Sequence, residues 1–269
     1  MNSTIGIMGC GWLGTPLAQH LIKKGQTVHG STTSSQKLIE LQKLGILPFK
    51  VSLSENGIEG SIKAFLKNVK VLVINVPPIL RGTNKENYED KMQHLLAAIK
   101  DSTVTRIIFI SSTSVYGELE GDVTETTLPH PETESGSQLV AVEEKFMNNP
   151  DLETTIIRFG GLIGPNRHPI TFLSGKKNLS NGNHPINLIH LEDCIQIIDT
   201  VIKEGYWGEI FNGVYPLHPS KRDYYLNEAK KRDLEAPEYS ESKNTEGKKV
   251  VPFNLIHYKK FRFQKTIIS

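Results

Sequence analysis

The chain has 269 residues, of which 38% are hydrophobic and 22% are charged, and its formal net charge is +2 at pH 7. This composition is typical of a globular domain, and the near balance of charge gives no indication of nucleic acid as a partner. No stretch reaches the roughly eighteen apolar residues that a membrane span needs, and the first residues lack a signal-peptide pattern, so we expect a cytoplasmic protein.

Short β-rich runs alternate with amphipathic helical patterns along the first part of the chain. This alternation predicts an α/β fold, with a parallel sheet covered by helices. Strands are expected at Thr4–Met8, Thr27–Gly30, Ile46–Val51, Val69–Asn75, Arg106–Ile110 and Thr154–Arg158. Helices are expected near 12–24, 35–44, 58–67, 86–101 and 135–149.

The alternation loosens after about residue 165. A strand at Ile186–His190 and a helix at Glu192–Lys203 are followed by a βαβ-like stretch through Ile210–Phe211, a helix at 220–232 and the tail Phe253–Ile268. We expect a dinucleotide-binding domain and a smaller C-terminal substrate lobe that interleave. The domain would comprise residues 1–165 plus about 186–212, and the lobe about 166–185 plus 213–269.

The most specific motif is the glycine loop Gly9-Cys10-Gly11-Trp12-Leu13-Gly14, which follows a strand and opens a helix. In a dinucleotide-binding loop the first glycine permits a tight turn, the second lets backbone amides approach the pyrophosphate, and the third lets helix and strand pack closely. We therefore expect Gly9, Gly11, Trp12, Leu13 and Gly14 to bind NAD or NADP at a helix N-terminus. The alternative is that these glycines only shape a turn.

The second predicted strand lacks the acidic residue that usually binds the ribose 2′-hydroxyl of NAD about twenty residues after the loop. Here the segment contains Ser31, Thr32, Thr33 and Lys37, and the first acidic residue of the whole chain is Glu40. Hydroxyls and a lysine would accommodate a 2′-phosphate, so the sequence favours NADP over NAD. The same residues could also serve only as a helix N-cap cluster.

Four stretches together resemble an extended short-chain dehydrogenase/reductase, the group that contains nucleotide-sugar epimerases and dehydratases. They are the glycine loop, the string Ile110–Gly117 (ISSTSVYG), the string Arg158–Pro165 (RFGGLIGP) and the string Ile189–Asp193 (IHLED). The resemblance implies a Rossmann-type doubly wound parallel sheet, a small C-terminal substrate lobe, a nicotinamide cofactor and a nucleotide-sugar or similar polar substrate. It also implies a homodimer formed through the helices near 86–101 and 135–149.

The resemblance places the carbonyl-polarising serine of the family at Ser112, and we expect the neighbouring Ser111 to contact the cofactor. The family's acid/base tyrosine, with a lysine four residues later, is missing. Depending on the alignment, the tyrosine falls on Ser135 or Ser137 and the lysine on Leu139 or Ala141, and no tyrosine occurs between Tyr116 and Tyr206.

Atypical members of the group share this loss, and the Gly-Trp-Leu-Gly form of the loop resembles theirs. The resemblance implies that Asn75, Val76 and Pro77 lie against the pyrophosphate and ribose of the cofactor. The two prolines after this strand could instead merely end it.

Several other side chains have two interpretations. Tyr116 is a substitute proton donor or a packed aromatic that closes its loop. Arg167 and His168 are substrate contacts or a solvent-facing pair, and His190 and Asp193 are expected to set a strand-to-helix junction. Cys10 and Cys194 lack the spacing of metal ligands and are expected to be buried or half-buried thiols, so no metal site is expected.

The sequence therefore predicts an NAD(P)-dependent oxidoreductase or epimerase with an atypical active site, in which Ser112 and Tyr116 are the catalytic candidates. The alternative is a catalytically silent NADP-binding sensor that has kept the dinucleotide pocket and lost the acid/base pair.

Overall fold

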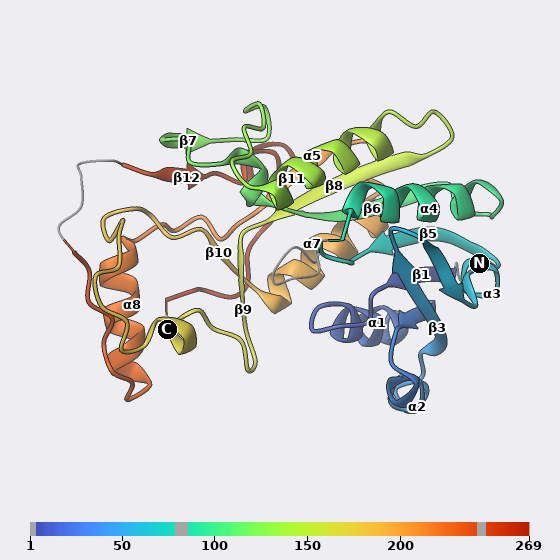
Figure 1. Ribbon diagram of the computed structural model, residues 1–269, viewed down its shortest axis with the longest axis horizontal. Coiled ribbons are helices and arrows are strands. Elements are labelled where there is room, and N and C mark those ends of the chain that lie inside the picture. Colours follow the sequence, from blue (N-terminus) through green and yellow to red (C-terminus); the bar gives the residue numbers. More distant parts are fainter. Residues whose placement is uncertain (1–3, 79–85, 241–245, 269) are drawn as a thin grey trace.

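An eight-stranded sheet runs through the part of the chain that the computed structural model describes, residues 4–78, 86–240 and 246–268 (Figure 1). Its strand order is β11-β8-β6-β5-β1-β2-β3-β4, and every neighbouring pair is parallel except β3 and β4. The strands are β1 (Thr4–Met8), β2 (Thr27–Thr32), β3 (Leu47–Ser54), β4 (Gly57–Gly60), β5 (Val69–Ile74), β6 (Arg106–Ser112), β8 (Glu153–Phe159) and β11 (Ile210–Gly213). The predicted Rossmann-type α/β sheet is confirmed.

Helices cover both faces of this sheet, as Figure 1 shows. One face carries α1 (Gly14–Lys23), α2 (Ser35–Lys43) and α7 (Leu191–Glu204), and the other carries α3 (Ile62–Leu66), α4 (Tyr88–Lys100) and α5 (Glu134–Met147). Because side chains alternate along a strand, β5 sends Val71 and Val73 into the first core and Leu72 and Ile74 into the second. The near-continuous apolar run of β5 follows from burial on both faces.

A smaller group of elements lies beside the sheet, with α8 set well apart from it in Figure 1. Part of this group shares a third core, which includes Ile170, Leu188 and Tyr224. They form two short parallel pairs, β9 with β10 and β12 with β7. The elements are β7 (Gly121–Val123), β9 (Gly161–Ile163), β10 (Leu188–His190), β12 (Lys248–Val250), α6 (Ile170–Leu173), α8 (Lys221–Lys231), the 3₁₀ turn η1 (Thr113–Tyr116) and the π-helical turn η2 (Asn254–Tyr258).

Two predicted segments differ from the structure. The expected helix near 58–67 divides into the antiparallel strand β4 and the short helix α3, because Gly60 (φ +95°) turns the chain where a Cβ would lie 2.1 Å from the Lys50 carbonyl oxygen. The expected βαβ unit after residue 210 is wrong, since β12 pairs with β7 and not with β11.

The predicted division into a sheet domain and a C-terminal lobe stays a prediction. Two residues after 213 pack into the sheet's cores, Val250 on the α3–α5 face and Leu255 on the α1–α7 face. Both cysteine thiols, at Cys10 and Cys194, are free and buried. Among the described residues no helix is long and apolar enough to cross a membrane.

Candidate cofactor and substrate site

The glycine loop lies at the carboxyl end of β1, where the strand order reverses between β1 and β5. Gly9 has a φ of +100°, and a Cβ there would lie 2.6 Å from the Asn75 carbonyl oxygen. A Cβ on Gly14 would lie 2.2 Å from the Gly9 carbonyl oxygen, so this glycine lets α1 pack against β1. Around Gly11 nothing lies within 4 Å of a built Cβ, so the chain itself does not require glycine there. Open space at Gly11, beside two sterically required glycines, fits a ligand that approaches the backbone closely.

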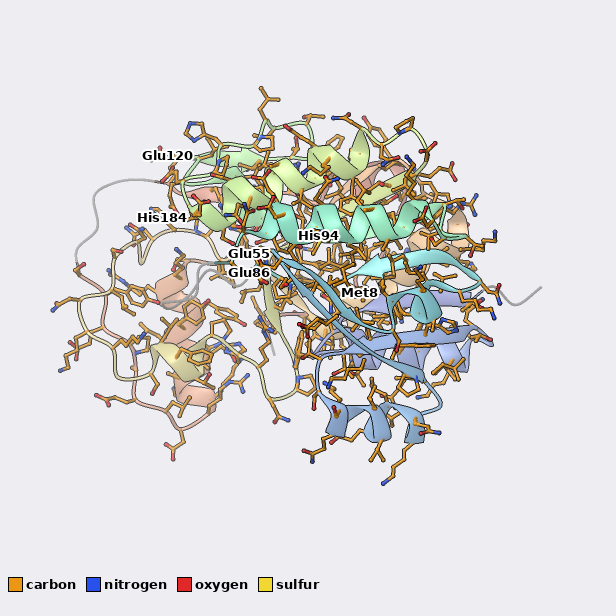
Figure 2. The ribbon with its side chains drawn as sticks, turned by 45° about the vertical axis from the view of Figure 1, so that its right-hand side comes forward. Met8, Glu55, Glu86, His94, Glu120 and His184 are labelled. Carbon is orange, nitrogen blue, oxygen red and sulfur yellow. The ribbon has the colours of Figure 1, made fainter. Side chains whose placement is uncertain are left out.

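Neighbouring strands hold this loop in place. The Gly9 amide donates to Ser31 Oγ (2.9 Å) and the Cys10 amide to the Ser31 carbonyl (2.9 Å). Ser31 Oγ in turn donates to Sδ of Met8 (3.1 Å), which ends β1 and is labelled in Figure 2. On the other side, Asn75 Nδ2 donates to the Gly9 carbonyl (3.1 Å). Ser31 and Asn75 therefore shape the loop from both sides, which adds a structural role to the cofactor contacts predicted for them.

Helix α1 begins at Gly14, and no side chain caps its N-terminus at Leu13. The first amides of a helix have no partner within it, and together they carry a partial positive charge. Because this end opens beside Gly11, the amides at the start of the helix and the helix dipole can bind a pyrophosphate.

Two adjoining cavities flank the loop. One measures about 740 Å³ and the other about 390 Å³, and both are lined by Gly11, Asn75, Val76 and Pro77. They therefore meet at the point where the strand order reverses, the usual place for a dinucleotide in this architecture. All of the predicted cofactor residues except Gly14 line this pair of cavities.

The smaller cavity has a basic and hydroxylated lining at its far end. Ser31, Thr32, Thr33, Lys37 and Lys91 contribute to it, and no carboxylate is among its described lining residues. Such a lining suits the adenosine half of a dinucleotide, with or without a 2′-phosphate.

Lys91 of α4 is a member of this lining that the sequence analysis missed. Its side chain is 5% exposed, and Nζ lies 2.6 Å from the Glu86 carboxylate. Glu86 lies near Glu55 and His94 beside α4 (Figure 2), where His94 Nε2 and the Glu55 carbonyl oxygen are 3.0 Å apart. A signal for Lys91 was available, because this lysine interrupts the apolar stripe of an amphipathic helix.

The larger cavity extends from the glycine loop to the end of β6. Ser111, Ser112, Thr113 and Ser114 line it, together with Leu139 of α5. Ser112 Oγ accepts the Ser114 amide (3.1 Å) as the N-cap of η1, so its own hydroxyl hydrogen is free to donate. Leu139, one of the two positions at which the resemblance places the family's lysine, presents an apolar side chain here. Among the described lining residues there is no tyrosine.

Tyr116 is not among the residues that line this cavity. It is fully buried, and its hydroxyl lies 3.1 Å from the Thr124 carbonyl, 2.9 Å from Asn212 Oδ1 and 2.9 Å from Arg158 Nη1. Burial raises its pKa, although the nearby Arg158 charge lowers it in part. The expectation that Tyr116 donates a proton to substrate does not agree with this placement; the interpretation as a packed aromatic does.

Tyr116 belongs to a buried polar network. Arg158 Nε donates to both Glu143 oxygens (3.1 Å each), Arg158 Nη2 donates to Oε2 (2.6 Å), and Ser111 Oγ donates to Oε1 (2.5 Å). This network connects β6, α5 and β8. Ser111 belongs to the network and also lines the cavity, so the network fixes the cavity wall at the end of β6.

The remaining candidates lie in different surroundings. Arg167 lines the larger cavity, with its guanidinium 5.0 Å from the centre of the Trp12 ring, so it lies at the glycine-loop end. His168 is buried instead and meets the Tyr224 hydroxyl at 3.0 Å, which agrees with neither predicted interpretation. His190 caps α7 through its Nδ1, as expected. The buried Asp193 instead accepts the amides of Gln264 and Lys265, so it binds the C-terminal tail to α7.

Comparisons with known proteins agree with this geometry. The model of a family described as NAD(P)H-binding matches residues 9–188, more than half of the chain. The chain belongs to this NAD(P)H-binding family.

Relatives and solved structures extend the comparison. Protein YeeZ of Escherichia coli (strain K12) is 35% identical over 248 residues, 92% of this chain and 90% of that protein. YtcB of Bacillus subtilis (strain 168), described as an uncharacterized UDP-glucose epimerase, is 26% identical over 233 residues, 75% of this chain and 73% of its own. The structure of UDP-glucuronic acid 4-epimerase from Bacillus cereus in complex with NAD has a TM-score of 0.78 at 20% identity and covers 98% of this chain and 92% of that one. The resemblance to epimerase/dehydratase-like short-chain dehydrogenases is confirmed.

Proposed function

We propose that this protein is an NAD(P)-dependent oxidoreductase or epimerase of the extended short-chain dehydrogenase/reductase type, acting on a nucleotide-sugar or a similar polar small molecule. The observation that carries this proposal is the joined pair of cavities, which runs from the hydroxyl-rich end of β2 past Gly11 to Ser112. One end suits the adenosine half of the cofactor, and the other has room for nicotinamide beside a substrate.

The residues of the chain have separate roles in this proposal. The Trp12 and Leu13 amides beside the N-terminus of α1, together with Asn75, hold the pyrophosphate. Ser112 donates its free hydroxyl hydrogen to the substrate oxygen and so polarises a carbonyl. The bound nicotinamide supplies or accepts the hydride. We propose that solvent exchanges the proton, because neither Tyr116 nor Leu139 offers an acid/base group to the cavity.

NADP is the preferred cofactor in this proposal, because the adenosine end combines hydroxyls with Lys37 and its described lining has no carboxylate. Lys91 adds less to this preference, since its charge is already paired with Glu86. Titration calorimetry should give NADP an affinity about tenfold higher than NAD, on the order of one charge-assisted contact. Lys37→Glu should remove this preference, and Gly11→Asp should abolish the binding of both cofactors. Equal affinities in the parent protein would contradict the preference, and unchanged binding by Gly11→Asp would contradict the site.

The chemical step is tested separately from cofactor binding. Absorbance of the reduced nicotinamide should change with UDP-glucose or UDP-glucuronic acid as substrate if net oxidation occurs, and chromatography should detect the epimer if none does. A protein that binds NADP tightly and converts no member of a panel of nucleotide-sugars and carbonyl compounds would instead support the alternative of a catalytically silent NADP sensor. The apolar Leu139 in the larger cavity favours that alternative.

We also propose a cytoplasmic homodimer formed through α4 and α5, two helices that pack against each other on one face of the sheet. Light scattering in solution should then give twice the mass of the chain. The mass of a single chain would contradict the dimer.

A further inference from the structure

Lys248 enters the larger cavity from a distant part of the chain. It begins β12 and lies opposite Gly121 of β7, and the Gly121 amide donates to the Gly247 carbonyl (3.0 Å). On the other side of the backbone, Asn187 Nδ2 donates to the Lys248 carbonyl (2.9 Å). The backbone of Lys248 is therefore fixed on two sides, and its side chain lines the cavity beside Ser112.

The Lys248 ammonium is bound by the chain only in part. Nζ donates to the carbonyl of Thr113 (3.1 Å) and to the carbonyl of Gly117. An ammonium has three donors, so one N–H is left after these two contacts. Among the described residues no carboxylate oxygen lies within 4.0 Å of Nζ, and the side chain is half-buried. Burial of this kind lowers the pKa of Lys248, because the charged form loses solvation, although the charges of Glu118 and Glu132 raise it in part.

The charged side chains described in the lining of the larger cavity are cationic, and this indicates what kind of ligand the Lys248 ammonium could bind. The cations in its described lining are Arg167 and Lys248, and no carboxylate is present in that lining to balance them. Arg167 lies against Trp12 at the cofactor end, whereas Lys248 lies at the Ser112–Ser114 end, where the reaction would take place. A half-buried cation bound only to carbonyl groups loses free energy of solvation, and an anionic ligand would compensate for that loss.

We propose that Lys248 is a substrate-binding residue, whose ammonium binds an anionic oxygen of a phosphate or carboxylate group on the substrate. This inference rests on the proposed function, because it takes the Ser112 end of the cavity as the substrate site. A purely structural role, in which Lys248 joins the two ends of η1 through their carbonyl groups, requires hydrogen-bond donors and no positive charge. The two roles can therefore be separated by variants that keep the donor and remove the charge.

The test compares Lys248→Gln, which retains N–H donors, with Lys248→Arg, which retains the charge. Lys249→Gln is the matched control, because Lys249 is the next residue, is partly exposed and pairs with Asp122 (3.0 Å) outside the cavity lining. All proteins are loaded with NADP and titrated by calorimetry with UDP-glucose, UDP-glucuronic acid and inorganic pyrophosphate. We expect Lys248→Gln to weaken binding of at least one probe tenfold or more, Lys248→Arg to retain most of it, and Lys249→Gln to stay within about twofold of the parent protein.

The pattern across probes identifies the anionic group. An equal loss for both UDP-sugars and for pyrophosphate assigns Lys248 to phosphate, and a loss confined to UDP-glucuronic acid assigns it to carboxylate; both support the proposal. If Lys248→Gln binds every probe as the parent protein does, or if the parent binds none of them, the proposal is overturned. If Lys248→Gln binds as the parent does and the parent still turns over a nucleotide-sugar, the proposed function stands without a role for Lys248. If the parent binds none of the probes, nucleotide-sugars are excluded as substrates as well.

Discussion

Substitution of Gly11 and of Gly14 by alanine should separate an effect on stability from an effect on cofactor binding. The Cβ of Gly14→Ala would lie 2.2 Å from the Gly9 carbonyl oxygen, so strand and helix must separate by roughly 1 Å to restore an ordinary contact. Overpacking of this kind costs about 1–3 kcal/mol, which for a chain of this size lowers Tm by about 2–5 °C. The Cβ of Gly11→Ala meets nothing within 4 Å, and Gly11 does not have a positive φ, so its Tm without ligand should stay within about 2 °C of the parent value.

Cofactor binding should respond in the opposite way. At an NADP concentration of about 100 times Kd the parent protein gains about 2.7 kcal/mol of stability, and a tenfold weaker variant gains only about 1.4 kcal/mol. Thermal unfolding with and without NADP should therefore show an unchanged Tm but a strongly reduced ligand-induced shift for Gly11→Ala. If Gly11→Ala lowers Tm without ligand as much as Gly14→Ala does, or keeps the full NADP shift, the assignment of open space at Gly11 to the pyrophosphate is wrong.

Three further predictions concern residues around the cavity. Ser112→Ala should lower turnover of any accepted substrate about a hundredfold or more, which kinetics would measure. Tyr116→Phe should chiefly lower the free energy of unfolding, by about 1–3 kcal/mol in denaturant, because it leaves buried polar partners unsatisfied. A stability loss for Ser112→Ala and a turnover loss for Tyr116→Phe would contradict these assignments. Glu143→Gln should cost about 3–5 kcal/mol, because it leaves the Arg158 guanidinium buried without its charge partner, and a midpoint in urea equal to that of the parent would contradict this. Burial lowers the pKa of His168 to about 4, below its ordinary value of 6.5, so the unfolded chain takes up the proton first as pH falls. Up to about 3 kcal/mol of the free energy of unfolding should therefore be lost between pH 6.5 and pH 4. Unfolding measured across this range should show a flatter profile for His168→Gln, and a profile equal to that of the parent would contradict the prediction.

Apart from β4, which was expected as part of a helix, the sheet was predictable because its strands have local signals. The strand at Thr4–Met8 was expected with its observed bounds. The buried strand Val69–Ile74 was also expected, with its end placed one residue too late, at Asn75. Apolar side chains on both faces and a glycine loop before a helix are properties of adjacent residues, and they need no knowledge of the rest of the fold.

The short strands were not predictable in the same way. β7 and β12 have three residues each, and their parallel pairing joins parts of the chain more than 120 residues apart, so neither has a local pattern. Lys248 was missed for this reason, since it resembles any solvated lysine until β12 places it in the cavity. Tyr116 was misjudged as a catalytic candidate for the opposite reason. Its motif is local, but the side chains that surround its hydroxyl come from β8 and β11.

The wide spacing of the cavity-lining residues also affects how the chain can fold and be cleaved. The larger cavity is complete only when Lys248 joins the lining residues at 11–13, 75–78, 110–114 and 159–162. Lys248 is synthesised after nearly all of these residues have had time to pair within the sheet. Contacts between such distant residues form slowly, because a long loop must close before they contribute stability. Dinucleotide affinity should therefore develop during synthesis before the substrate wall of the cavity is complete. Proteolytic cleavage between α8 and β12 should then give a nicked protein that still binds NADP but binds substrate more weakly.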